Sequence, residues 1–104
     1  MNIINLTPHV LNILTPEGAV EVAPSGEVAR VAVTTTEAEP VGGIPVTVAS
    51  YGKVENLPDP AEGNIFVVSG MVEAQVQRQD VFAPGNLVRD GEGKPVGCEG
   101  LKQT

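Results

Sequence analysis

The stretch that decides the fold is NIFVVSGMVEAQVQR, residues 64–78. Its first part, residues 64–69, has four apolar β-branched and aromatic side chains between Asn64 and Ser69, which predicts the most hydrophobic strand of the chain, in a central position. After it the spacing changes, because Ser69 can cap a helix and the next apolar residues recur at helical intervals. We therefore expect one short helix over residues 69–78. A helix of this length is unstable alone and must pack on a sheet.

Short strands and turns extend from this stretch in both directions. Valine accounts for seventeen of the 104 residues and aromatic side chains for only three, a composition that favours strands. Polar, turn-rich residues 34–43 predict a mobile loop. The expected strands are residues 3–6, 10–14, 19–23, 28–33 and 44–51, with a closing hairpin over 86–101 that turns at 90–93. The sequence thus predicts one domain, residues 1–104, of the mainly β (α+β) class: a compact, mostly antiparallel, barrel-like sheet with one short helix.

Composition and charge narrow the range of partners. Thirteen acidic against six basic side chains give a formal net charge of −7, which argues against binding to a nucleic acid polymer. The lone Cys98 cannot form an intramolecular disulfide, and no zinc-ligand spacing occurs, so we expect no metal and no cofactor. Without a leader-like or membrane-spanning segment, we expect a cytoplasmic protein with no membrane partner. A valine core stabilises a monomer weakly, which favours a homo-oligomer.

The only histidine, His9, follows a Thr7-Pro8 corner, and three interpretations of it stay open. Pro8 breaks the chain between two strands, and Thr7 and His9 can satisfy the backbone around that corner. His9 could instead contact a ligand. As the only side chain with an unperturbed pKa near neutrality, it could also serve a small hydrolase, although no nucleophile or orienting carboxylate can be assigned to it. The usual nucleotide-binding and hydrolase motifs are absent.

Positive charge is concentrated towards the C-terminal end, where four of the six cations lie: Arg78, Arg89, Lys94 and Lys102. Arg78 and Arg89 each lie close to an aspartate, Asp80 and Asp90 respectively. Two arginines can hold a phosphate or carboxylate between them, and a helix that begins after Ser69 offers free backbone amides to the same anion. Equally, each arginine can pair with its neighbouring aspartate. Arg30, in a nearly apolar strand, also needs a partner or a ligand.

Several short segments together resemble a family of small proteins from bacteria and their phages. They are NLTPH at 5–9, the VS at 68–69, the arginine and aspartate at 78 and 80, and VRD-G-x-G at 88–93, with further likeness at 43–45, 57–58, 84 and 97. The family has no established activity, so the resemblance implies a phage-type origin and a compact fold. Phage proteins of this size include host-defence antagonists that sequester a signalling nucleotide between subunits, a similarity of scale and setting.

The function predicted from these features is non-enzymatic. We expect an oligomer that binds a small anionic ligand, such as a signalling nucleotide, and so acts against host defence. The expected ligand-binding residues are His9, Arg30, Ser69, Arg78 and Arg89. The alternatives are a protein-interaction or structural module without a small-molecule ligand, and a small hydrolase that uses His9.

Overall fold

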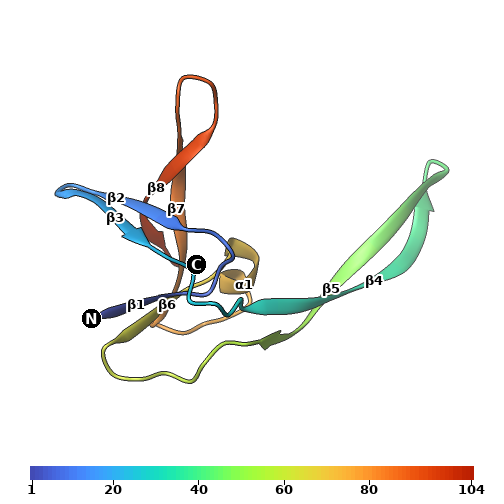
Figure 1. Ribbon diagram of the computed structural model, residues 1–104. Helices are drawn as coiled ribbons and strands as arrows, with labels where there is room; N and C mark the ends of the chain where they lie inside the picture. The colour runs from blue at the N-terminus through green and yellow to red at the C-terminus, as the bar shows by residue number, and fades with distance from the viewer.

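The computed structural model describes all 104 residues and contains eight strands and one helix. In chain order these are β1 (Asn2–Asn5), β2 (Leu11–Thr15), β3 (Gly18–Val22), β4 (Arg30–Val41), β5 (Ile44–Glu55), β6 (Asn64–Val67), α1 (Gly70–Ala74), β7 (Val81–Arg89) and β8 (Pro95–Lys102). Six strands form one sheet in the order β1-β6-β7-β8-β2-β3, whereas β4 and β5 pair only with each other. Figure 1 shows this ribbon projecting from the body of the protein as a long arm.

The body is a strongly curved mixed sheet. Three short parallel ladders join β1 to β6, β6 to β7 and β2 to β8, while the antiparallel ladders of β2–β3 and β7–β8 are longer. An isolated bridge between Asn5 and Pro24 links the end of β1 to the chain just after β3, so the two edges of the sheet nearly meet. The predicted mainly β, mostly antiparallel and barrel-like fold with one short helix is therefore confirmed.

The strand β6 organises the core because neighbours lie on both of its sides and its side chains alternate between two faces. Phe66 and Val68 belong to one buried cluster, and Val67 belongs to another. The first cluster is completed by Leu6, Ala29, Val72 and Val81, and the second by Leu11, Ile13 and Cys98. The prediction that this strand lies inside the sheet is thus confirmed, and its side chains are buried on both faces.

The helix is shorter than the sequence pattern predicts. Ser69 caps it as expected, accepting a hydrogen bond from the Val72 backbone N–H at 3.3 Å, but α1 ends at Ala74 rather than near residue 78. After Ala74 the backbone N–H groups of Gln75 and Val76 bond to the carbonyl oxygens three residues back, those of Val72 and Glu73, which tightens and ends the last turn. Val76 still packs against the first core cluster. Glu73 is buried, and its carboxylate accepts hydrogen bonds from the backbone N–H and the hydroxyl of Thr104.

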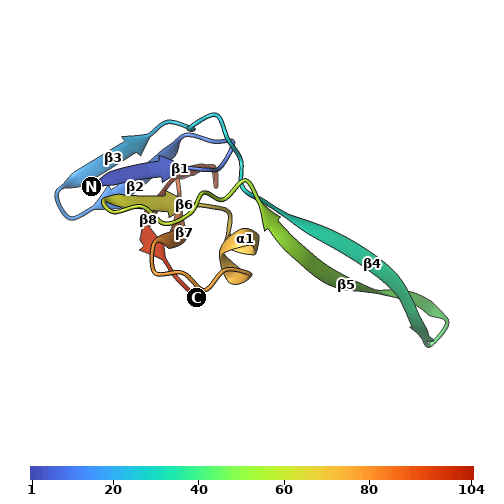
Figure 2. The same cartoon turned by 90° about the horizontal axis from the view of Figure 1, so that it is seen from below.

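The predicted mobile loop over residues 34–43 is wrong, because most of it lies within β4. The turn is made by Gly42 and Gly43, whose φ angles are 57° and 80°. Positive φ at both positions suits the two-residue turn of a hairpin, and Val41 pairs with Ile44 across it. The β-branched residues before the turn extend the strand instead of interrupting it. In Figure 2 this segment points away from the body, so it does not cover any surface of its own body.

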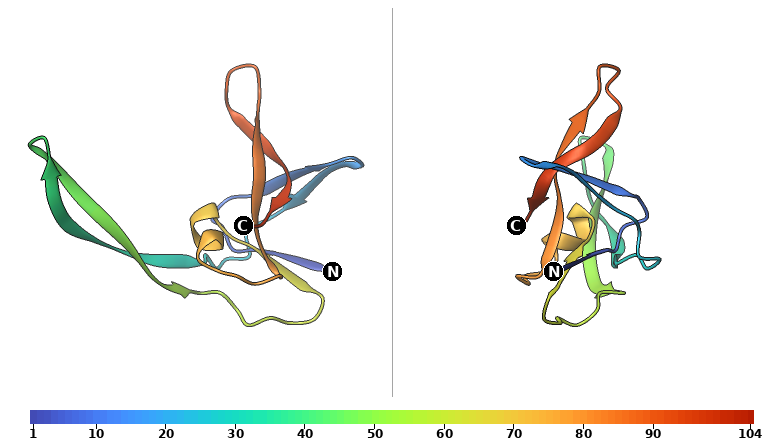
Figure 3. Two further views of the ribbon diagram at one scale, coloured as in Figure 1. Left: turned by 180° about the vertical axis from the view of Figure 1, so that it is seen from behind. Right: turned by 60° about the vertical axis from the view of Figure 1, so that its left-hand side comes forward.

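The arm accounts for the unusual dimensions of the molecule. The radius of gyration is 16.6 Å. A compact chain of this length has a radius of gyration of about 13 Å. Figure 3 shows the body gathered around β6, β7 and α1, with the arm extended to one side. No helix here has the length and apolar character needed to cross a membrane.

Candidate functional site

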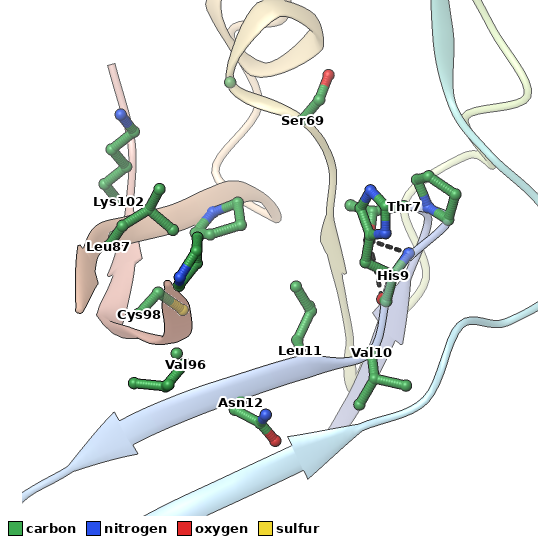
Figure 4. A pocket seen from close by; sticks show the side chains of 16 residues that line it. Thr7, His9, Val10, Leu11, Asn12, Ser69, Leu87, Val96, Cys98 and Lys102 are labelled. Atoms are coloured by element: carbon green, nitrogen blue, oxygen red, sulfur yellow. Dashed lines mark hydrogen bonds between the residues drawn. The ribbon is translucent and has the colours of Figure 1, made fainter. Parts of the chain in front are cut away.

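An open basin of about 1100 Å³ lies between β2, the β7–β8 hairpin and the segment that leads into α1. Its lining includes the apolar side chains of Leu11, Leu87, Val96 and Cys98. Figure 4 shows these four side chains on the β2 and β7–β8 sides of the basin. Leu11 and Cys98 also belong to the second core cluster, so the bottom of the basin is the outer surface of that core.

Two glycines allow the walls of the basin to approach each other. A Cβ atom on Gly85 would overlap the backbone carbonyl oxygen of Glu99, and one on Gly97 would lie 2.8 Å from the carbonyl oxygen of Asn12. Both glycines line the basin. The pairing of β8 with β7 and β2 at this point therefore requires residues without side chains.

The NLTPH corner forms one side of the basin, and buried Asn5 holds it together. The Asn5 amide nitrogen donates to the carbonyl oxygens of His9 at 2.7 Å and Val22 at 3.1 Å. Its side-chain oxygen accepts from the Thr7 backbone N–H at 2.9 Å and from the Thr7 hydroxyl at 2.7 Å. One amide thus fixes the corner and connects it to β3. Sequence reasoning missed this role, for which the only signal is a polar residue at the end of an apolar strand.

His9 contributes to the corner through its backbone only. Its N–H donates to the Thr7 hydroxyl oxygen at 3.4 Å, and its carbonyl oxygen accepts from Asn5 and Thr7. The imidazole forms no hydrogen bond with any other side chain, is exposed and lines the basin (Figure 4). The predicted role of Thr7 as a corner residue is confirmed, while the His9 side chain remains available to a ligand.

Ser69 and Lys102 bring two further polar groups to the basin. The Ser69 hydroxyl accepts the capping hydrogen bond from Val72, yet Ser69 is exposed and lines the basin on the α1 side. Lys102 ends β8 and lies across the basin from His9 (Figure 4). Lys102 was not predicted as a site residue, although the gathering of cations near the C-terminal end was a signal for it. The helix α1 has only five residues, and neither Arg78 nor Arg89 lines the basin beside its start.

Arg78 is fully engaged inside the protein. Its Nε and Nη2 donate to the two carboxylate oxygens of Asp80 at 3.0 and 2.7 Å, and its Nη1 donates to the Pro58 carbonyl oxygen at 3.0 Å. Its guanidinium also lies 5.8 Å from the centre of the Phe66 ring, within reach of a cation–π contact. The hydrogen bonds from Arg78 hold the pKa of Asp80 below its usual value, because they favour the ionised carboxylate. Of the two interpretations of this arginine, internal pairing is the one observed.

Neither Arg89 nor Arg30 lines the basin. Arg89 ends β7 and donates to the Gly93 carbonyl oxygen at 2.9 Å, while Asp90 accepts from the backbone N–H groups of Glu92 and Lys94 in the hairpin turn. Arg30 is exposed at the root of the arm, opposite Glu55. Arg78 lies three residues before the nine-residue strand β7, and Arg89 is the last residue of that strand. At the rise of an extended strand, about 25 Å or more separates these two residues.

The predicted ligand-binding set is therefore divided. His9 and Ser69 lie at the basin, but Arg30, Arg78 and Arg89 do not. The clamp of arginines expected from the sequence does not form within one chain, because β7 has one arginine before it and the other at its end. Lys102 is the only lysine or arginine that lines the basin.

Comparison with known proteins adds no identification. Neither a protein-family model, nor a curated protein, nor a solved structure matches this chain.

Proposed function

We propose that this protein is a non-enzymatic, self-associating binding protein whose basin takes a small anion with an apolar ring, such as a nucleotide. The observation that carries the proposal is the basin itself, where an apolar surface is bordered by the exposed residues His9 and Lys102. Small-molecule sites generally combine mostly apolar walls with a few converging polar groups. A ring stacked on the apolar side chains would place a charged group near Lys102.

The size of the basin supports this class of ligand. Its volume is about 1100 Å³. Small-molecule sites have volumes of roughly 300 to roughly 1000 Å³. The open basin lies just above that range and so has room for a ligand as large as a nucleotide. With a net charge of −7, the surface as a whole repels anions, so attraction depends on the local cation at Lys102. The arginines are not needed for this arrangement, and the proposal therefore replaces them with Lys102.

A hydrolytic role has less support. The Thr7 hydroxyl is already bonded to Asn5 and to the His9 backbone, and no carboxylate hydrogen-bonds to the His9 imidazole. Nucleophilic catalysis generally needs a base aimed at the nucleophile and a third group that orients the base. His9 is accordingly proposed as a ligand contact. Sequestration of a signalling nucleotide against host defence is the proposed biological role, by analogy of size and setting with phage proteins that antagonise host defence.

The proposal is tested by isothermal titration of the intact protein with a panel of mono-, di- and cyclic nucleotides. We expect at least one nucleotide to bind, and both His9→Ala and Lys102→Met to weaken its affinity about tenfold or more, equivalent to about 1.4 kcal/mol. Methionine preserves most of the apolar stem of the lysine and removes its charge.

Arg89→Met provides the matched control, because it removes an exposed cation that does not line the basin. Its affinity should equal that of the wild-type protein. Absence of heat with every nucleotide, or an equal loss of affinity in the Arg89→Met variant, would contradict the proposal.

A further inference from the structure

The β4–β5 arm is exposed along almost its whole length and carries large apolar side chains into solvent. Val41 and Ile44 at its tip are 67% and 66% exposed, and Val48 is 50% exposed. Only the root is covered, where Val31 and Val54 pack against the first core cluster. An isolated two-stranded hairpin is at best marginally stable in water, because it cannot bury its side chains.

The exposed area of the protein is larger than a monomer of its mass should have. The accessible surface of this 10.8 kDa chain is 7233 Å². Folded monomers of this mass expose about 5500 Å². The excess of about 1700 Å² is larger than the roughly 800 Å² that each partner buries in a stable protein–protein interface. The chain as a whole, of which the arm is the most exposed part, thus has enough surface for a permanent contact.

The register of the hairpin places the apolar side chains of its outer half on one face. Paired residues share a face, and alternate pairs lie on opposite faces. The pairs Thr36–Val48 and Ala38–Val46 lie on one face, and Ile44, two residues before Val46, continues it. The pairs on the other face of the outer half, Thr35–Ala49 and Glu37–Thr47, are polar or small. Val41 pairs with Ile44 and so lies on the same face as Val46 and Val48. We call the apolar side chains of this face the distal apolar face: Ala38, Val41, Ile44, Val46 and Val48.

The edges of the arm are protected near its tip. Pro40 and Pro45 lie on its two strands close to the turn, and neither can donate a backbone hydrogen bond to an added strand. The register also shifts between Ala38 and Val41, a second device that discourages edge pairing. Contact through the arm is therefore expected through side chains on a face and not through addition of a strand.

We infer that the distal apolar face of the arm packs against a second copy of this chain. The excess exposed area of the chain is large enough for a permanent interface, and the partner present wherever the chain folds is another copy of itself. The contact buries further apolar area, in addition to the small area buried in the valine-rich core of the body. Because the proposed function includes self-association, this contact rests on it, but it does not depend on the ligand.

The test compares two double variants of the full chain by analytical ultracentrifugation without ligand. Ile44→Lys with Val48→Lys places two charges on the distal apolar face, and Thr35→Lys with Thr47→Lys places two on the opposite face of the same hairpin. We expect an oligomer for the wild-type protein and for the threonine variant, and a monomer for the Ile44/Val48 variant. Circular dichroism checks that each variant retains its strands, and Ile44→Thr with Val48→Thr, expected to shift the equilibrium towards monomer, replaces the lysine pair if that pair unfolds.

The outcomes separate the two proposals. A monomeric wild-type protein would overturn the inference together with the self-association in the proposed function. An oligomer that survives in the Ile44/Val48 variant would overturn the inference alone. Nucleotide binding is measured independently by titration, so its failure leaves this result unchanged.

Discussion

The body and the arm use similar residues in opposite ways. In the body, valines of β6 and α1 are almost completely buried, and polar groups such as Asn5 are satisfied internally. In the arm, valines and threonines form a regular ladder, but most of their side chains remain exposed. β-branched residues thus determine where a strand forms, whereas the burial of their side chains depends on what packs against the sheet. Substitutions should therefore be costly in the body and inexpensive at matched positions of the arm.

The largest difference should come from two glycines. Gly85→Ala would push a methyl group into the Glu99 carbonyl oxygen at the edge of the basin. We expect it to lower the free energy of unfolding by about 3 kcal/mol. In the arm, a Cβ at Gly52 would lie 3.3 Å from the Ala32 Cβ. Gly52→Ala should therefore cost less than about 1 kcal/mol. Urea denaturation of both variants measures the difference, and equal losses would contradict the comparison.

A smaller loss is expected at the NLTPH corner. Asn5→Ala removes hydrogen bonds to Thr7, His9 and Val22 and leaves buried polar groups without partners, so it should cost about 2 to about 3 kcal/mol. Asn2→Ala is the control, because the Asn2 side chain makes one exposed hydrogen bond to Asn64. Thermal unfolding should show a clear fall in Tm for the first variant and little change for the second. Similar Tm values for the two would show that the corner does not depend on Asn5.

The smallest effect concerns the Arg78–Asp80 ion pair and depends on pH. The pKa of Asp80 is lowered mainly by hydrogen bonds from Arg78, so the ionised carboxylate stabilises the folded state. This contribution is complete above the unfolded-state pKa, about 3.9, and is lost as the pH falls through the lower folded-state pKa. Asp80→Asn should therefore cost about 1 to about 2 kcal/mol at neutral pH, and the difference from wild type should shrink below about pH 4.

Glu55→Gln in the arm serves as the control for this ion pair, since Glu55 forms no salt bridge. Its free energy of unfolding should follow the wild-type curve at every pH. A difference between Asp80→Asn and wild type that stayed constant into the acid range would contradict the role assigned to the ion pair.

The fold was predictable where local patterns decide it. The apolar run of residues 64–69, the Ser69 cap and the hairpin turn at 90–93 all lie where the sequence placed them. Strands were predicted over 28–33 and 44–51, which lie in β4 and β5, but residues 34–41 of β4 were missed because their threonines and glutamates resemble a loop. Gly42-Gly43 carried the signal of a tight turn. The parallel ladders were not predicted, because they join segments that are distant in the sequence.

The candidate site was predictable only in part. His9 and Ser69 were chosen from local context and line the basin, whereas the arginines were grouped by their closeness in sequence. Along an extended strand that closeness becomes a large separation, which is why Arg78 and Arg89 lie at opposite ends of β7. Lys102 reaches the basin only because β8 pairs with both β7 and β2, a long-range arrangement that no local pattern reveals.

Hydrogen–deuterium exchange tests the central claim most directly. The wild-type protein is measured at two concentrations, one above and one below the dissociation constant of the proposed oligomer. Amides of β6 and of the NLTPH corner should be protected at both concentrations, because the body buries them within one chain. The proposed contact between the arm and a second copy predicts that amides of β4 and β5 are protected at the high concentration and exchange much faster at the low one. Arm exchange that is equally slow or equally fast at both concentrations would contradict this account.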